Sequence, residues 1–530
     1  MGAFLRTERI VLAMMQAFEP LPRRLPVLAL WMLLAGACGD AADDGHATGG
    51  TDTADRAEGP DAAADAEEAD SGTAAAPGAG AITVLGPITA GNGAFTIPIV
   101  DLAALGYTEE EYFFEGEASA YAHAGEATMD GKWQLEVVDT AAFKTRLLVR
   151  RPSAAADFNG TVVIEWLNVS GGVDADPGFI YNHELLLRDG YAWVGVSAQA
   201  VGIQGGGFSL GAGGVPLKDF DPERYGTLLH PGDGFSYDIY GQAARIVRGE
   251  GDMDVLGGLE PEQLIAYGES QSAARMVSYV NGVHPLSLLH DGFFIHSRGV
   301  GGASFDNAMS LIPDGILGGS VVHIRDDLDE PVLQLQTETD VHGMLGFLPA
   351  RQPDRDGLRT WEVTGTAHAD QHMLDVSAGA SSDLTGSALS CPDANDGPQH
   401  FVVKAALHAL NGWIVDGAAP AMGEVLMVDD SRAAITDEHG NTLGGIRTPA
   451  VDVPIAIHSG NPPPGSTNLL CSLFGSTTPF AADKLAELYP SHQDYVDKVQ
   501  AAAEAAVQAG FVLPPEAETF IAEAEAADVP

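Results

Sequence analysis

The stretch that decides the fold is LIAYGESQSAAR, residues 264–275. Its apolar first half is typical of a buried strand, and its alanine-rich second half favours a helix. Between them, Gly268 and Ser272 stand two positions before and two positions after Ser270. A sharp turn from strand to helix needs small residues at both places, and serine at 272 meets this need although glycine is usual there. The pattern predicts that a strained turn lifts the Ser270 hydroxyl clear of a sheet.

A serine hydroxyl is a weak nucleophile until a base takes its proton. We expect that base after a late strand, because the chain order for this kind of turn is serine, acid, histidine. His368 follows the last predicted strand and fits this position. His372, four residues later at helical spacing, is the alternative. His296 and His342 are predicted to be structural or pocket histidines.

The acid that orients the histidine is expected after the preceding strand. The segment PVLQLQTETD, residues 331–340, ends in Asp340 shortly after such a strand. Glu338 is the alternative, because the length of a turn cannot be read from sequence to within two residues. The sequence therefore predicts a Ser270, Asp340 and His368 triad.

Backbone donors are also needed, because attack on a carbonyl group creates an oxyanion. The N–H of Gln271, directly after the serine, is the expected first donor. The second is expected in the loop after the apolar segment 160–168, from Val169 or Ser170. A plain glycine turn is the alternative for that loop.

Further apolar and amphipathic segments alternate along the chain. Strands are predicted at 111–121, 142–150, 160–168, 191–197, 263–267, 292–296, 332–336 and 359–363, and helices at 181–188, 235–248, 400–415, 483–510 and 515–527. Alternation of strand and helix favours a mostly parallel sheet with helices on both faces, which is an α/β fold.

Seven short motifs resemble the bacterial alpha/beta hydrolase domain family. They are EWLNVSG at 165–171, GESQS at 268–272, HSRG at 296–299, QTETD at 336–340, GTAH at 365–368, GGIRTP at 444–449 and CSLFGS at 471–476. The resemblance covers residues 100 to about 525. It implies an α/β-hydrolase fold with Ser270, Asp340 and His368 in the triad positions of a secreted or periplasmic serine hydrolase, and it leaves the substrate open.

The function predicted from these features is cleavage of a small-molecule carboxylic ester through an acyl-enzyme, without a metal or organic cofactor. Amide or peptide cleavage is the alternative within enzymes. A non-catalytic surface binding protein that keeps the fold is the alternative in another class. The pocket walls are expected at 200–235 and 300–320. Arg298 is expected either to orient a substrate carboxylate or carbonyl group or to form a structural ion pair.

Residues 1–38 resemble an export signal. Two arginines at 23–24 precede the apolar run LPVLALWMLL, residues 25–34, and AGAC at 35–38 is similar to a lipobox that ends in a lipidated Cys38. The alternative to lipidation is simple cleavage near Ala37. Separately, Met14 or Met15 is the alternative to Met1 as the translation start. The expected location is the bacterial cell envelope, either periplasm or outer surface, with the lipid on Cys38 as the only contact with the membrane.

The charge of the chain is strongly negative, with a formal net charge of −48. Such a field repels phosphate backbones, so nucleic acid is not an expected partner. Residues 39–80 are acidic and poor in apolar side chains, with Arg56 as the only Lys or Arg, and they are predicted to form a disordered tether.

The chain contains 3 cysteines. With lipid on Cys38, the other two, Cys391 and Cys471, are predicted to form a disulfide in an oxidising compartment, and two independent thiols are the alternative. The hydrolase core is expected at 81–395. Residues 396–530 are expected to be a C-terminal extension that packs on the core and is joined to it by this disulfide.

Overall fold

The structure, a computed structural model, describes residues 80–530 except 96–99, 207–213, 307–318, 380–390, 392, 464 and 467–469. The predicted export signal with Cys38, and all but the last residue of the predicted tether, lie outside these residues. So do parts of the two expected pocket walls, at 207–213 and 307–318. Within the described residues, no helix has the length and apolar character needed to cross a membrane.

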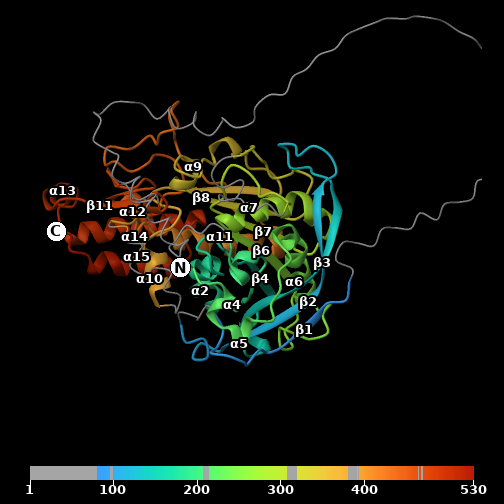
Figure 1. Cartoon of the computed structure of the whole chain (residues 1–530). Helices are drawn as coiled ribbons and strands as arrows, with labels where there is room; N and C mark the ends of the chain where they lie inside the picture. The colour runs from blue at the N-terminus through green and yellow to red at the C-terminus, as the bar shows by residue number, and fades with distance from the viewer. Residues whose placement is uncertain are drawn as a thin grey trace, which may run out of the picture. The chain divides into compact units, whose positions relative to one another are not determined.

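A large mixed sheet forms the centre of the described chain (Figure 1). Its strands are β1 (Thr83–Leu85), β2 (Tyr107–His123), β3 (Leu135–Pro152), β4 (Thr161–Trp166), β5 (Ala192–Val196), β6 (Gln263–Glu269), β7 (Gly292–His296), β8 (Val332–Thr337) and β9 (Leu358–Val363). They lie in the order β1-β2-β3-β5-β4-β6-β7-β8-β9. The pairs from β5 to β9 are parallel, and β1, β2 and β3 extend the sheet in antiparallel fashion.

Helices cover both faces of this sheet, as the sequence predicts. The helices are α2 (Pro177–Arg188), α3 (Ala200–Gln204), α4 (Leu217–Phe220), α5 (Pro222–Tyr225), α6 (Ser236–Val247), α7 (Gln271–Ser278), α8 (His284–Ser287), α9 (Glu338–Val341), α10 (Gln371–Gly379), α11 (Gln399–Asp416), α12 (Pro449–Asp452), α13 (Ala482–Leu488), α14 (His492–Ala509) and α15 (Pro514–Ala526). Apolar side chains of α6 and α7 pack on one face, and those of α2 and α11 pack on the other. The fold is the three-layer α/β-hydrolase arrangement.

The alternation of side chains along β4 explains why its sequence is almost continuously apolar. Val162 and Ile164 point into the core beneath α6 and α7, whereas Val163 points into the core beneath α2 and α11. A parallel strand with helices on both sides has no face toward water, so apolar residues are needed at every position. The predicted fold class is confirmed.

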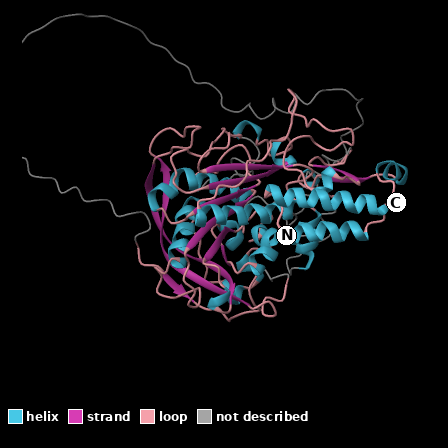
Figure 2. Ribbon diagram, turned by 180° about the vertical axis from the view of Figure 1, so that it is seen from behind, coloured by secondary structure: helices cyan, strands magenta, loops and turns pink. Residues whose placement is uncertain are grey.

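The C-terminal part divides at the end of α11. Val403 and Leu407 of this helix share a hydrophobic cluster with Leu333 of β8, so α11 belongs to the layer that covers the sheet although it follows the predicted boundary at 396. After it, α14 and α15 lie side by side around a separate cluster (Figure 2). A small sheet of β10 (Ala456–Ser459) and β11 (Ser476–Pro479) lies in the same part of the chain.

The predicted helix at 483–510 was wrong in one respect, because the structure has two helices there, α13 and α14. Pro490 separates them, and proline cannot donate the backbone hydrogen bond that a helix interior requires. The hydroxyl of Ser491 then accepts a hydrogen bond from the N–H of Asp494 at 3.2 Å, which caps the start of α14.

Candidate active site

The turn between β6 and α7 holds Ser270 in an unusual backbone conformation. Its φ angle is 58°, in the left-handed region that a residue with a side chain rarely adopts. The N–H of Ser270 donates to the carbonyl oxygen of His296 at 2.9 Å, which fastens the turn to the end of β7. The predicted strained turn is therefore present at the carboxyl end of the central parallel strand.

The two small residues around Ser270 have distinct roles in this turn. A Cβ atom on Gly268 would lie 2.6 Å from the carbonyl oxygen of Ser272, so only glycine fits at 268. The hydroxyl of Ser272 donates to the carbonyl oxygen of Glu269 at 2.7 Å and accepts from the N–H of Glu269 at 3.0 Å. Serine at 272 thus fits where glycine is usual and bridges the turn with its own side chain.

Ser270, His368 and Asp340 form one chain of hydrogen bonds. Nε2 of His368 lies 2.8 Å from Oγ of Ser270, and Nδ1 of the same ring lies 2.7 Å from Oδ1 of Asp340. The three residues follow β6, β9 and β8, whose carboxyl ends meet at one edge of the sheet. In this arrangement an imidazole can take the proton of a serine hydroxyl while a carboxylate stabilises the resulting cation.

Asp340 is fixed by the start of α9. Its Oδ2 accepts from the N–H of Thr337 at 2.7 Å, and its own N–H donates to Oγ1 of Thr337 at 3.4 Å. This reciprocal capping box leaves Oδ1 free to face His368. The carboxylate is fully buried, so its orientation is determined by the protein rather than by solvent.

A family model described as "Alpha/beta hydrolase domain" matches residues 84–522. The chain belongs to this alpha/beta hydrolase domain family. No curated protein matches this hydrolase in sequence.

The solved structures to which this chain is similar include a serine hydrolase and esterases. One is a serine hydrolase without a lid from Xanthomonas campestris, with 14% identity over 52% of this chain and 97% of that chain and a TM-score of 0.26. A fungal esterase from Rhizomucor miehei is 12% identical over 62% of this chain and 100% of its own, with a TM-score of 0.30. The esterase Est22 is 11% identical over 59% of this chain and 83% of its own, with a TM-score of 0.30.

Glu338, the alternative acid, has a different position in this hydrolase. Its Oε1 accepts from the N–H of Gly365 at 2.7 Å, and its Oε2 accepts from the N–H of Gly460 at 3.0 Å. Burial raises the pKa of this carboxyl, and the two backbone donors oppose that rise. Glu338 thus connects Gly365, in the loop that carries His368, with Gly460 in the C-terminal region. Asp340 is the carboxylate that contacts the imidazole.

His372, the alternative base, lies on α10 and stacks on another histidine. Its ring centroid is 3.7 Å from that of His400, with the rings nearly parallel. Burial lowers the pKa of His372 to about 4, so its ring is neutral near pH 7. The structure brings His368, and not His372, to the hydroxyl of Ser270.

The side chains of His296 and His342, the other two histidines predicted from the sequence, are buried near the site. Nδ1 of His296 lies 2.8 Å from the hydroxyl of Tyr267, and its Nε2 lies 2.8 Å from Nε2 of Gln399. Burial lowers the pKa of His296 to about 3, so this ring is a neutral link between β7 and α11. Burial also lowers the pKa of His342, whose Nε2 lies 3.8 Å from Glu338.

Arg298 has neither of its two predicted roles. It is fully buried, and it donates to the carbonyl oxygens of Gly299, Val300 and Val322 and to Oε1 of Gln334. No carboxylate among the described residues forms an ion pair with it, and burial lowers its pKa to about 9. The guanidinium group instead satisfies several backbone acceptors at once, a pattern that sequence spacing does not reveal.

The loop after β4 supplies one free backbone donor near the serine. The N–H of Ser170 is already bound to Oδ1 of Asn168 at 2.8 Å, so Ser170 was a wrong candidate. The N–H of Val169 makes no hydrogen bond to any residue that the structure describes. The amide of Asn168 donates to the carbonyl oxygen of Glu269 at 3.0 Å and so holds the loop against the turn. Val169 and Gln271, the first residue of α7, remain the predicted pair of donors.

Two effects oppose each other at His368. Burial favours its neutral ring, but the charge and hydrogen bond of Asp340, with a smaller contribution from Glu269, outweigh burial and raise the pKa of His368. The sequence alone does not mark Glu269 as a site residue, although Glu269 lies inside the GESQS motif. A carboxyl side chain at the end of a strand is usually solvated, and nothing in the sequence indicates that this one is 3% exposed.

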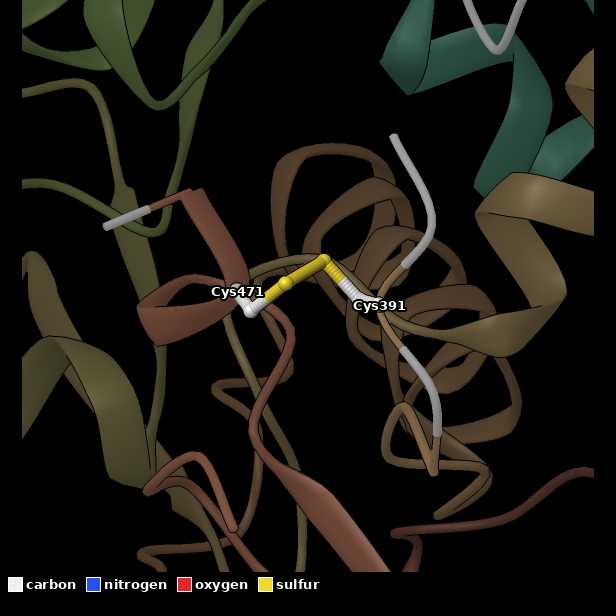
Figure 3. The surroundings of a disulfide bond; sticks show 2 residues. All are labelled: Cys391 and Cys471. Carbon is white, nitrogen blue, oxygen red and sulfur yellow. A yellow bond between two sulfur atoms is a disulfide. The ribbon is translucent and has the colours of Figure 1, made fainter. Parts of the chain in front are cut away.

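The C-terminal region supports the loop that carries His368. The N–H of Ala369 donates to the carbonyl oxygen of Leu473 at 2.9 Å. The side-chain amide of Asn395 donates to the carbonyl oxygen of Gly365 at 3.2 Å. Cys391 and Cys471 lie beside these contacts with their sulfur atoms facing and Cα atoms 5.3 Å apart (Figure 3). This Cα separation is within the range of disulfides, as the predicted pairing requires.

Proposed function

We propose that this hydrolase cleaves carboxylic esters through an acyl-enzyme on Ser270. The observation that supports the proposal most directly is the hydrogen-bonded chain from Ser270 through His368 to Asp340. In a folded protein, a strained turn costs about 1–3 kcal/mol, and such turns are concentrated at functional sites. A serine on such a turn, with a base and an acid already aligned, is suited to attack a carbonyl carbon.

The proposed reaction has two halves. In the first, His368 takes the proton of Ser270 as Oγ attacks the ester carbonyl, and the N–H groups of Gln271 and Val169 stabilise the oxyanion. The imidazolium then returns the proton to the departing alcohol. In the second half, His368 takes a proton from water as the water oxygen attacks the acyl carbon, and the imidazolium then returns this proton to Oγ of Ser270 as the acid is released.

Paired substrates test this proposal directly. We expect p-nitrophenyl esters to be hydrolysed and the matching p-nitroanilides to be hydrolysed far more slowly, with Ser270→Ala abolishing both activities. Faster cleavage of the anilides would favour an amidase or peptidase. Absence of all turnover by the folded wild-type protein would favour a non-catalytic binding protein. A series of acyl chain lengths and aryl esters then defines the substrate class.

We also propose that the enzyme is exported and held at the cell envelope by lipid on Cys38. The proposal rests on the n-region, apolar run and AGAC segment of the sequence, residues 23–38. Expression of the full chain in a bacterial host, followed by fractionation, should place wild type in the membrane fraction and Cys38→Ser outside it. Equal distribution of the two proteins would contradict lipidation at Cys38.

A further inference from the structure

We propose that Glu269 is a positioning residue, a second carboxylate that stabilises the imidazolium of His368 formed when Ser270 gives up its proton. This inference rests on the proposed function, because it assigns Glu269 a role in the same proton transfer. It adds a charged group that the Ser270, His368 and Asp340 triad does not contain.

Carboxylates flank both nitrogens of the His368 ring. Oδ1 of Asp340 lies 2.7 Å from Nδ1, and Oε1 of Glu269 lies 3.7 Å from Nε2. The longer distance is within reach of an ion pair but too long for a hydrogen bond. Nε2 therefore keeps its hydrogen bond to Ser270, and Glu269 acts on the ring through its charge.

The side chain of Glu269 is held in this position by Asn168. The Asn168 amide donates both to the carbonyl oxygen of Glu269 at 3.0 Å and to its Oε2 at 3.1 Å. Asn168 itself is fixed because its Oδ1 accepts from the N–H of Ser170. One carboxylate oxygen is thus anchored, and the other, Oε1, is left facing His368.

The surroundings of Glu269 lack a permanent positive partner. Within the described residues, no lysine or arginine lies within ion-pair distance, and His368 is its one basic neighbour. Burying an ionised carboxylate without a cation costs free energy. A neighbour that becomes positive during a reaction offsets this cost and gives the buried Glu269 a role. In the proposed mechanism, His368 becomes such a cation at each proton transfer.

The other titratable groups that face Glu269 are Asp340 on α9, Tyr181 on α2 and Tyr267 on β6. Burial raises the pKa of Glu269 to about 7, with Asp340 adding to the rise and His368 opposing it. Burial also raises the pKa of both tyrosines, which stay neutral. Near neutral pH, Glu269 and His368 therefore titrate as a coupled pair, and a protonated ring favours an ionised Glu269.

The test is Glu269→Gln, which keeps the size of the side chain and an acceptor for Asn168 but removes the charge. We expect kcat for a p-nitrophenyl ester to fall about tenfold with little change in KM. The acid limb of kcat/KM should move about one pH unit lower, because an opposite charge near a histidine shifts its pKa by about this amount. Glu269→Asp retains the charge, so the acid limb of its kcat/KM profile should lie close to the wild-type pH.

Glu338→Gln is the matched control, since Glu338 is another buried carboxyl at this edge of the sheet but binds Gly365 and Gly460 instead of His368. The acid limb of kcat/KM for Glu338→Gln should stay at the wild-type pH. If Glu269→Gln weakens folding, histidine NMR in a Ser270→Ala background gives the pKa of His368 without activity, and it should be lower when Glu269 is replaced.

Two failures are distinguishable. If the acid limb and the pKa of His368 are unchanged in Glu269→Gln, the role of Glu269 is overturned. The proposed function still stands in that case, provided that Ser270→Ala is inactive. Ester turnover that survives Ser270→Ala would overturn the proposed function itself.

Discussion

Oγ of Ser270 and Nε2 of His368 lie 2.8 Å apart although the two residues are 98 positions apart in the chain. Their strands, β6 and β9, are separated in the sheet by β7 and β8. The contact exists because the turn after β6 projects Ser270 above the strand ends and the loop after β9 reaches back toward it. Activity therefore depends on how both segments are held.

Ser270→Ala should reduce ester turnover about 10⁴-fold or more, because no other group replaces the nucleophile. The fold should persist, since alanine removes only a hydroxyl oxygen. Turnover of a p-nitrophenyl ester and a thermal melt measure the two effects. Ser272→Ala is the control, as it removes the hydrogen bonds across the turn but keeps the nucleophile. A loss in Ser272→Ala as large as that in Ser270→Ala would contradict the assignment.

Asp340→Asn should lower kcat about 10⁴-fold with a small change in stability, because an amide orients the wrong tautomer of the imidazole. Glu338→Gln should mainly lower the melting temperature, since Glu338 ties together the backbone at Gly365 and Gly460. Steady-state kinetics and thermal melts of both variants make the comparison. If Glu338→Gln loses activity and Asp340→Asn keeps it, the acid has been assigned to the wrong residue.

The pH profile should report the state of His368. Asp340 raises the pKa of this buried ring above its ordinary value of 6.5. Only the neutral ring can take the serine proton, so kcat/KM should rise with pH through a midpoint above 6.5. A midpoint below 6.5 for a well-folded enzyme would show that burial, and not Asp340, dominates at His368.

Asp370→Asn should make the protein less sensitive to alkaline pH. Asp370 is fully buried, and burial raises its pKa from 3.8 to about 7, whereas the unfolded chain ionises at the ordinary value. Between these two pH values the folded state binds the extra proton, so the free energy of unfolding falls as pH rises. Asparagine keeps an acceptor for the N–H of Met373 and has no proton to lose.

Denaturant titrations at pH 5 and pH 8 test this expectation. Between pH 5 and pH 8, the free energy of unfolding of Asp370→Asn should rise relative to that of wild type by about 2–3 kcal/mol. A constant difference between variant and wild type at both pH values would show that Asp370 does not titrate in this range.

The sequence identified the elements whose local pattern matches their tertiary role. Small residues around Ser270 are required by the turn itself, and the apolar run at 160–168 is required by helices on both faces. The fold class and the place of Ser270 at the site followed from these local constraints, and the chain order serine, acid, histidine pointed to His368. The predicted strand at 292–296 agrees with the bounds of β7.

Other features depend on contacts between distant segments and were not predictable. The choice between Asp340 and Glu338 depends on two residues of turn length, and both carboxyls are buried. Ser170 failed as a donor because the side chain of Asn168 occupies its N–H. Arg298 is surrounded by carbonyl oxygens from three chain segments, a set of partners that only the folded chain assembles.

Replacement of Cys391 and Cys471 by serine should lower stability by about 4.5 kcal/mol, as the chain-entropy model gives for a loop of this length. The two residues are separated by 80 positions. Cys471 lies two residues from Leu473, whose carbonyl oxygen binds the N–H next to His368. The same replacement should therefore also lower kcat, because the loop that carries the base loses support.

Denaturant titration and ester kinetics of the double variant, compared with wild type treated with a reductant, measure both effects. If the predicted disulfide forms, reduction of wild type should lower stability and kcat as much as the double replacement does, because each change removes the same link between Cys391 and Cys471. Alkylation of two thiols in the native, unreduced protein would contradict the pairing. In that case hydrogen bonds such as those of Asn395, Ala369 and Glu338 would hold the His368 loop without a covalent link, and the serine variant should retain full activity.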